Sequence, residues 1–264
     1  MIFQYKNQHL YYELHGSGPD LLFLHGNCLD SNIWNSYIPK LQNRYRLILV
    51  DLPGNGRSAD VEADSISVCV QSIVALLHAL QAEKPICIGH SLGAYFVLEL
   101  LRSTSLSIAG IVLFHGHCFG DSPIKKTARD RVLKFIKRRG MKAYAPLFVA
   151  QLFNSKFAQE HESLVQKYIH AIANIPSDRF ESMHHVMYHR ASCAELLRDF
   201  NRPILIIAGA EDLIIPQKLN FNQAALGPIT EVALLDCAHM GMIEQPEKSL
   251  ETLNRFFNFC TLMA

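Results

Sequence analysis

The chain has 264 residues, of which 49% are hydrophobic and 19% charged, and its 25 Lys plus Arg against 24 Asp plus Glu give a formal net charge of +1 at pH 7. This balance argues against a dedicated nucleic-acid-binding protein, because neutralising phosphates takes a basic excess over the whole chain. The length predicts one or two domains with a core that needs no disulfide or metal staples.

Three features bear on where the protein works. Residues 1–16 alternate polar and apolar types and lack the apolar core of a secretory signal, so no removable leader is expected. The sequence has no run of about 18 apolar residues, which predicts no membrane span. The seven cysteines are odd in number and lack C-x-x-C spacing, as is typical of buried thiols in a reducing compartment. We therefore expect a cytoplasmic protein.

The elements alternate along the chain. Period-two alternation over 2–5 and 9–14 predicts a hairpin, and residues 31–42 are expected to form a helix opened by a Ser or Asn cap. The short apolar runs are typical of strands covered on both faces; they lie at 21–25, 46–51, 85–90, 108–116, 203–209 and 231–236. Further helices are expected over about 64–80, over 92–102 and from Pro246 onward. This order predicts an α/β fold, a mostly parallel sheet flanked by helices.

One region breaks the alternation. From about Asp121 to Arg198 only helical periodicity appears, which predicts a helical insertion between two strands of the sheet. Such an insertion lies above the carboxyl edge of a parallel sheet, where ligands bind, so residues 121–198 are a candidate lid. The core then comprises residues 1–120 and 199–264.

The sharpest chemical signal is the segment Gly89-His90-Ser91-Leu92-Gly93, which fits G-x-S-x-G between a predicted strand and a predicted helix. A serine on so tight a turn takes a strained backbone conformation, and its flanking positions need glycine because a side chain would collide with neighbouring elements. The hydroxyl then stands exposed at a helix N-terminus that favours developing negative charge. Ser91 is therefore the candidate nucleophile.

A serine nucleophile needs a base, which an acid must orient. Among 13 histidines the best candidate is His239, because it follows the last predicted strand at the same sheet edge as Ser91. Asp212 follows the preceding strand and is the candidate acid, and serine, acid, base is the chain order typical of this nucleophile turn. Glu211 is a rival acid, and Asp121 is a weaker one.

Five motifs in order make the chain resemble an α/β-hydrolase over nearly its full length. They are LFLHGNC (22–28), DLPGNGRSAD (51–60), IGHSLGA (88–94), AGAEDLIIP (208–216) and DCAHMGMIEQPE (236–247). The resemblance implies that backbone N–H groups of Asn27 and Leu92 form the oxyanion hole. Donors of this kind contribute about 3 to 4 kcal/mol each in acyl transfer.

Two cofactor readings are set aside. Residues 54–59 formally match G-x-G-x-x-G/A, but Pro53 opens a turn and a polar stretch precedes the next helix, so no helix N-terminus is expected to hold a pyrophosphate. His184, His185 and His189, or His115 with His117, could present imidazoles to a metal, but no acid or cysteine accompanies them at the usual spacing. We expect neither cofactor nor metal; His115 and His117 either line the pocket or face solvent.

The serine nucleophile limits the reaction, since related dehalogenases and epoxide hydrolases carry Asp at this turn and dienelactone hydrolases carry Cys. Esters, thioesters, lactones, amides or C–C bonds remain, and a carboxylic ester is the default. Some apolar lid residues are expected to line an acyl pocket; the candidates are Met141, Tyr144, Phe148, Phe153, Phe157, Met183, Met187 and Tyr188. A hydrolase-like ligand receptor with little turnover, and a cofactor-free lyase, are the alternatives.

A basic stretch lies at the start of the candidate lid. Between Lys125 and Lys142 there are nine Lys or Arg and one acid, Asp130. A solvated face is one interpretation. The other is docking of an acidic partner, an acyl carrier protein or coenzyme A, by charge complementarity.

Overall fold

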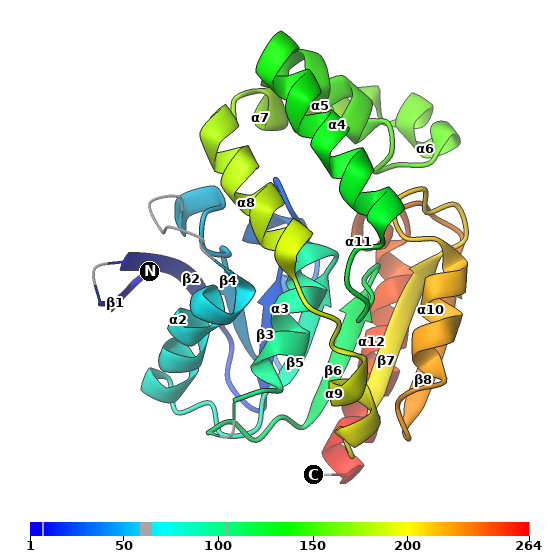
Figure 1. The fold of residues 1–264 in the computed structure, drawn as a ribbon. Coiled ribbons are helices and arrows are strands. Elements are labelled where there is room, and N and C mark those ends of the chain that lie inside the picture. The colour runs from blue at the N-terminus through cyan, green and yellow to red at the C-terminus, as the bar shows by residue number, and fades with distance from the viewer. Residues whose placement is uncertain (7, 59–64, 104, 264) are drawn as a thin grey trace.

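The strands form one sheet of eight in the computed structural model, which describes all residues except 7, 59–64, 104 and 264 (Figure 1). The strands are β1 (Ile2–Tyr5), β2 (Gln8–His15), β3 (Asp20–Leu24), β4 (Arg46–Val50), β5 (Ile86–His90), β6 (Gly110–Phe114), β7 (Ile204–Gly209) and β8 (Thr230–Leu235). Their order is β1-β2-β4-β3-β5-β6-β7-β8, with β1 and β2 antiparallel and the others parallel. The predicted fold class is confirmed.

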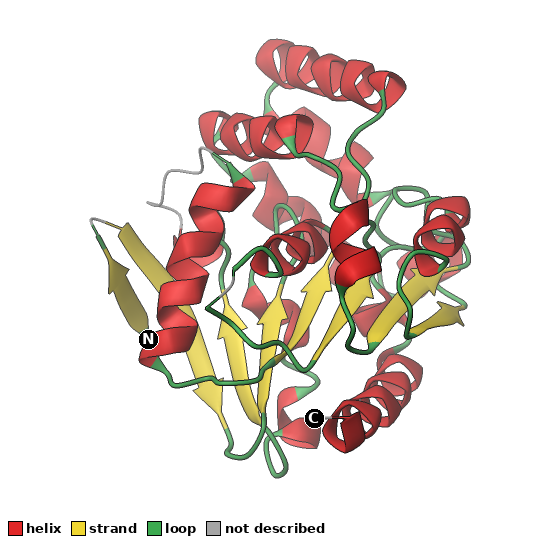
Figure 2. Ribbon diagram, turned by 60° about the horizontal axis from the view of Figure 1, so that its bottom comes forward, coloured by secondary structure: helices red, strands yellow, loops and turns green. Residues whose placement is uncertain are grey.

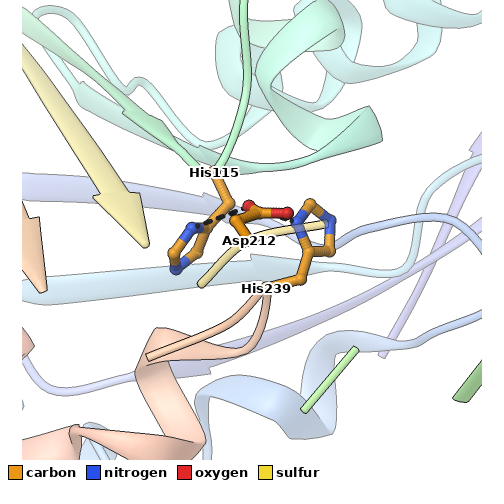
Figure 3. A group of neighbouring side chains, drawn as sticks. All are labelled: His115, Asp212 and His239. Carbon is orange, nitrogen blue, oxygen red and sulfur yellow. Dashed lines mark hydrogen bonds and ion pairs between the residues drawn. The ribbon is translucent and has the colours of Figure 1, made fainter. Parts of the chain in front are cut away.

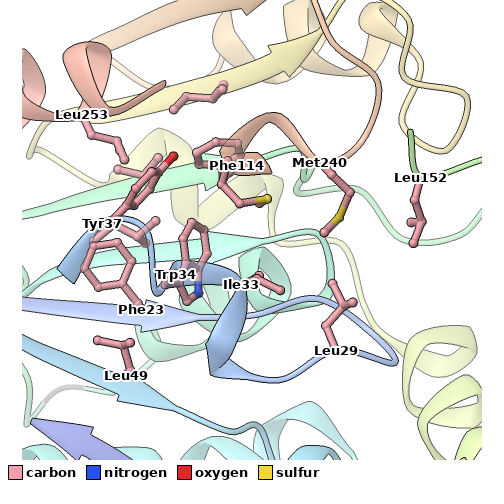
Figure 4. Packing of buried hydrophobic residues seen from close by; sticks show 14 of the residues in the cluster. Phe23, Leu29, Ile33, Trp34, Tyr37, Leu49, Phe114, Leu152, Met240 and Leu253 are labelled. Atoms are coloured by element: carbon pink, nitrogen blue, oxygen red, sulfur yellow. The ribbon is translucent and has the colours of Figure 1, made fainter. Parts of the chain in front are cut away.

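Helices cover both faces of this sheet (Figure 2). Leu22 and Leu24 of β3 point to one face, toward the side chains of α2 (Ile66–Ala79), α3 (Leu92–Leu100), α9 (Ala194–Asp199) and α10 (Gln217–Ala224). Leu21 and Phe23 point to the other, where Figure 4 shows Phe23, Trp34 and Tyr37 packed together near Leu253 of α12 (Pro246–Met263). Because both faces are covered, the central strands are apolar throughout rather than alternating.

Between β6 and β7 the described chain is helical. It forms α4 (Pro123–Arg139), α5 (Met141–Val149), α6 (Ser155–Glu160), α7 (Glu162–Ala173), α8 (Ser177–His189) and then α9. Figure 1 shows α4 to α8 above the carboxyl ends of the strands, and these five helices are called the upper layer below. In contrast, α9 lies beside the sheet, where Leu197 belongs to the core. Helix α4 begins at Pro123 after the Ser122 cap and ends at Gly140, whose φ of 79° favours glycine.

The prediction of one continuous helix over 31–42 is wrong. The chain forms a 3-10 helix over Ser31–Trp34 and a separate short helix, α1, over Ile38–Leu41. Pro39 is the physical reason, because it lacks the N–H that a continuous helix would bond to the carbonyl of residue 35. Pro39 is instead accommodated in the first turn of α1.

Helix α10 was not predicted, because polar residues take its buried positions and an apolar residue is exposed, the reverse of the usual amphipathic pattern. Its buried side chains are Asn220 and Gln223, whereas Phe221 is exposed. Gln223 accepts a hydrogen bond from the N–H of Cys118 at 3.0 Å and donates one to the carbonyl of Gly116 at 2.8 Å. The helix therefore fixes the loop that follows β6.

All seven cysteines are buried, and none of them forms a disulfide. Among the residues that the structure describes, no helix combines the length and apolar character needed to cross a membrane.

Candidate active site

Ser91 lies at the junction of β5 and α3, with φ 52° and ψ −110°. A Cβ on Gly89 would lie 2.3 Å from the carbonyl oxygen of Gly93, and one on Gly93 would lie 2.4 Å from the carbonyl oxygen of Leu24. Both glycines are therefore required by close backbone approach. The strained turn holds the Ser91 side chain out of the core at the carboxyl edge of the sheet.

The structure brings His239 and Asp212 together from the loops after β8 and β7. His239 Nδ1 lies 2.8 Å from Asp212 Oδ2, and both side chains are almost fully buried. The other carboxylate oxygen of Asp212 accepts backbone N–H groups of Ile214 at 2.8 Å and Ile215 at 2.9 Å. These bonds fix the carboxylate so that Nδ1 of His239 is occupied by Asp212 and Nε2 is left for another partner.

Neither rival acid meets His239. Glu211 is exposed, although it is the neighbour of Asp212 in sequence. Asp121 lies under the upper layer, where it pairs with Arg129 and, at 2.8 Å, with Arg190. Of the three acids considered from the sequence, only Asp212 contacts the candidate base.

His115 is a neighbour of Asp212 that the sequence did not assign to this role (Figure 3). It follows β6, is fully buried, and has a positive φ of 49°. The N–H of Gly241 donates to its Nε2 at 3.2 Å, so the ring proton sits on Nδ1, which lies 3.2 Å from Asp212 Oδ2. Two imidazoles, from the loops after β6 and β8 on either side of β7, thus face one carboxylate oxygen.

The electrostatics of this group favour an ionised acid. Burial opposes ionisation of Asp212, but His239 and His115 beside it hold the pKa of that carboxyl well below its usual range. Burial lowers the pKa of His115, against the opposing effect of Asp212, so the His115 ring is neutral. A fixed negative charge next to a candidate base is what stabilising an imidazolium requires.

Among the described residues, His115, Asp212 and His239 are the one set of His, Cys, Asp and Glu close enough to share a metal. Tetrahedral zinc with ligands at about 2.0 Å keeps its ligand atoms about 3.3 Å apart. The 2.8 Å separation of His239 Nδ1 from Asp212 Oδ2 is shorter than this and is that of a direct hydrogen bond, whereas the 3.2 Å separation of His115 Nδ1 from the same oxygen is close to it. The geometry fits a polar network better than a metal centre.

The other histidine sets do not converge. His184 is buried, whereas His185 and His189 are exposed, so the three do not face one point. His117 is buried against Tyr95, with its Nε2 at 3.3 Å from the phenol oxygen, and lines the same cavity as Ser91.

The loop after β3 carries Asn27, which lines the cavity with Ser91. His25 fixes this loop, since its Nδ1 donates to the carbonyl of Gly26 at 2.7 Å and its Nε2 accepts the N–H of Leu52 at 2.8 Å. Leu92, the first residue of α3, directly follows Ser91. The backbone N–H groups of Asn27 and Leu92 have no acceptor among the residues that the structure describes.

Two side chains that the sequence left without a role position the His239 loop. His90 donates from Nε2 to the carbonyl of His239 at 2.9 Å. Glu244, in α11 (Gly241–Glu244), accepts the N–H groups of Ala238 and Met240 on either side of His239, at 3.1 to 3.2 Å. The sequence did contain a signal for these two residues, because His90 lies inside the motif at 88–94 and Glu244 inside the motif at 236–247.

A cavity of about 220 Å³ is lined by Ser91 and His239 at the sheet edge and by residues of the upper layer. Of the eight apolar candidates, Tyr144, Phe148 and Met187 line it. Phe153 and Phe157 stack on each other instead, and Lys126 lies over the ring of Tyr188. The sequence pattern therefore identified the wall but could not separate cavity residues from packing residues.

The glycine-rich turn after β4 surrounds a buried carboxylate. Asp51 accepts the N–H and the Nε–H of Arg57, both at 2.8 Å. A Cβ on Gly56 would lie 2.5 Å from Asp51 Oδ2, which explains the glycine there. Helix α2 begins only at Ile66; the intervening polar stretch falls largely outside the described residues.

The basic stretch divides into two parts. Lys125 and Arg129 of α4 line the cavity. The remaining cations of the stretch, Lys126 apart, are exposed; they are Arg131, Lys134, Lys137, Arg138, Arg139 and Lys142.

The chain is similar to known proteins over most of its length. Residues 21–252 match the model of a family described as the alpha/beta hydrolase family. A 3-oxoadipate enol-lactonase of Acinetobacter baylyi is 24% identical over 91% of this chain and 89% of its own length. A pimeloyl-[acyl-carrier protein] methyl ester esterase of Nitrosospira multiformis is 22% identical over 94% of this chain and 97% of its own.

Solved structures show the same fold. A thermophilic esterase from Thermogutta terrifontis superposes with a TM-score of 0.88 at 24% identity, over 96% of this chain and 94% of its own.

Proposed function

Because the chain belongs to the alpha/beta hydrolase family, we propose that it is a serine hydrolase that cleaves carboxylic esters or lactones through an acyl-enzyme. One observation carries the proposal: Ser91 and His239 line one cavity, and Asp212 occupies the other ring nitrogen of His239. An alcohol, an imidazole and a fixed carboxylate are the parts that acyl transfer to serine requires.

In the proposed reaction, His239 Nε2 takes the proton of Ser91 as the hydroxyl oxygen attacks the carbonyl carbon. Asp212 holds the imidazolium that forms, and the proton then passes to the departing alkoxide. Water then attacks the acyl carbon and gives a proton to His239, which returns it to the Ser91 oxygen as the acid is released. In a lactone the alcohol and the acid leave as one molecule.

The developing oxyanion needs donors that are already in place. We assign this role to the backbone N–H groups of Asn27 and Leu92, in line with the lack of acceptors for them among the described residues. Their loops are held by His25 and by the turn at Ser91, so no reorganisation is needed at the moment of attack.

The cavity limits the substrate. Its volume of about 220 Å³ lies below the 300 to 1,000 Å³ typical of drug-sized ligands, which favours a small acyl group. Among the relatives, one is named for a lactone and one for a methyl ester, and both classes stay within the proposal.

Within the insertion at 121–198, the upper layer is proposed as a lid, while α9 packs beside the sheet. Helices α4, α5 and α8 supply Val132, Phe148 and Phe180 to the cavity, so the upper layer forms its roof. The carbonyl of Leu152 accepts the N–H of His239 at 2.9 Å, which ties this roof to the site. Movement of such a roof controls access of substrate and water.

The exposed cations of α4 are proposed to dock an acidic partner, an acyl carrier protein or coenzyme A. Reversing the charges of Arg138 and Arg139 should raise KM for a carrier-bound ester and leave KM for a small soluble ester unchanged. Reversing the charge of Lys40 on α1 should change KM for neither substrate. Equal effects on both substrates would contradict this docking. The burial of all seven cysteines, with no disulfide among them, supports a reducing, cytoplasmic setting.

The proposal is tested with p-nitrophenyl esters of increasing chain length, a thioester and a lactone, on wild type and Ser91→Ala. Steady turnover of short esters that Ser91→Ala abolishes is expected. A stoichiometric burst with little steady-state hydrolysis would favour a ligand receptor instead. Turnover that survives in Ser91→Ala would contradict the assignment of the nucleophile.

A further inference from the structure

The cavity next to Ser91 has a cationic wall. Lys125 and Arg129 lie one helical turn apart on α4, and both line the cavity. None of the described residues that line it is Asp or Glu. A substrate in the cavity therefore meets positive charge without a compensating lining carboxylate.

Asp121, the acid that pairs with Arg129, does not neutralise this cationic wall. Asp121, whose side chain is 2% exposed, is shared between the guanidinium groups of Arg129 and Arg190. Lys125, exposed at the edge of the cavity, forms no ion pair with a described carboxylate. Three cations thus face Asp121, and the ionised Asp212 beside His239 is a second anion that acts on Lys125, which leaves an excess of one positive charge.

Hydrogen-bonding capacity is also left over at this wall. His184 is buried and lines the cavity, and neither of its ring nitrogens has a hydrogen-bond partner among the described residues. Arg129 uses Nε on Asp121, and its Nη1 meets only the sulfur of Met187 at 3.6 Å, which is a weak acceptor. A buried donor without a partner costs about 1 to 3 kcal/mol, so an acceptor arriving here is favoured.

We propose that Lys125, Arg129 and His184 form an anion subsite, and that the substrate is the ester or lactone of a small acid bearing a second, free carboxylate. This inference rests on the proposed function for the reacting end of the substrate. A carboxylate matches the planar donor fork of arginine and the point charge of lysine, and it fits a cavity of about 220 Å³. The subsite would hold the free carboxylate while the ester carbonyl faces Ser91.

A matched pair of esters tests the subsite. Monomethyl glutarate and methyl valerate differ by a carboxylate in place of a methyl group. Wild type should show a kcat/KM for the half-ester at least tenfold above that for the neutral ester. Lys125→Met should reduce this ratio about tenfold, as expected for the loss of a charged hydrogen bond of about 1.4 kcal/mol. Lys156→Met, which removes an exposed charge from α6 of the upper layer outside the cavity, should preserve the ratio.

A binding measurement separates this inference from the proposed function. Calorimetry of glutarate with Ser91→Ala should show saturable binding that Lys125→Met weakens about tenfold and Lys156→Met does not. Binding of inorganic phosphate as tight as that of glutarate, or the same glutarate affinity in Lys125→Met, would overturn the subsite. Ser91-dependent hydrolysis of methyl valerate with no preference for the half-ester would also overturn it, while leaving the proposed hydrolase intact.

Discussion

Replacing Asp212 by asparagine tests the pairing of acid and base. The Oδ1 atom of Asp212 already accepts two backbone N–H groups, from Ile214 and Ile215, so the amide oxygen of an asparagine is held on that side. The amide NH₂ then faces the ring nitrogens of His239 and His115. A donor there forces His239 to accept at Nδ1 and to carry its proton on Nε2, where it cannot take one from serine.

The magnitude follows from the 2.8 Å separation of His239 Nδ1 and Asp212 Oδ2. Two unit charges at this distance attract by about 6 kcal/mol at an effective dielectric constant of about 20, which corresponds to about four powers of ten in rate. The same exchange in the triad of a serine protease lowers kcat about ten-thousandfold. We expect Asp212→Asn to lose a factor of about 1,000 to 10,000 in kcat.

The assay is the steady-state hydrolysis of p-nitrophenyl acetate at pH 8, with circular dichroism to confirm that the variant is folded. Glu211→Gln is the matched control, because it removes the same charge from the neighbouring, exposed residue; its kcat should stay within about twofold of wild type. A folded Asp212→Asn that keeps a tenth of wild-type activity, or a Glu211→Gln that loses as much as Asp212→Asn, would refute the pairing.

Three further predictions concern the surroundings of the site. His115→Ala should lower kcat about tenfold through loss of a donor to the charged acid, while His115→Asn, which tolerates positive φ and can still donate, should retain most activity; equal losses would argue against this role. Gly93→Ala should lower the free energy of unfolding in urea by about 3 kcal/mol or more because of the clash with Leu24, whereas Gly120→Ala, whose Cβ would meet no atom closer than 3.3 Å at an ordinary φ, should lower it by about 1 kcal/mol or less. Burial opposes ionisation of Asp51, but the hydrogen bonds that its carboxylate accepts lower its pKa from 3.8 to about 2. The ionised carboxylate therefore stabilises the fold by about 2 kcal/mol above pH 4, and this stabilisation is lost as the pH falls through about 2. Unfolding free energies of wild type and Asp51→Asn should therefore differ less at pH 3 than at pH 7, and a difference that grows on acidification would contradict the sign.

The sheet could be predicted because each central strand is buried on both faces. That burial makes runs such as Leu21–Leu24 and Ile204–Gly209 apolar throughout, which is visible without coordinates. Helix α10 could not be predicted in the same way. Of its buried polar side chains, Gln223 bonds to the backbone of the loop after β6 and Asn220 accepts a hydrogen bond from Gln223, and a hydrophobic periodicity cannot reveal such roles.

The candidate site was predictable where local geometry demands a residue type. Only glycine fits at positions 89 and 93, two residues before and after Ser91, so the G-x-S-x-G motif predicts the turn. The contact of His115 with Asp212 depends on β6 and β7 being neighbours and on a positive φ at position 115, and neither follows from the residue type. The division of α4 into cavity-lining and outward-facing cations likewise depends on how the helix is set above the sheet.

The most direct test of the proposed chemistry is mass spectrometry of the protein quenched in acid during turnover of a slow ester. An increase in mass equal to the acyl group, located on the peptide that contains Ser91 and absent from Ser91→Ala, is the predicted result. Turnover without any adduct on this peptide in wild type, under conditions where deacylation limits the rate, would contradict a covalent mechanism at Ser91.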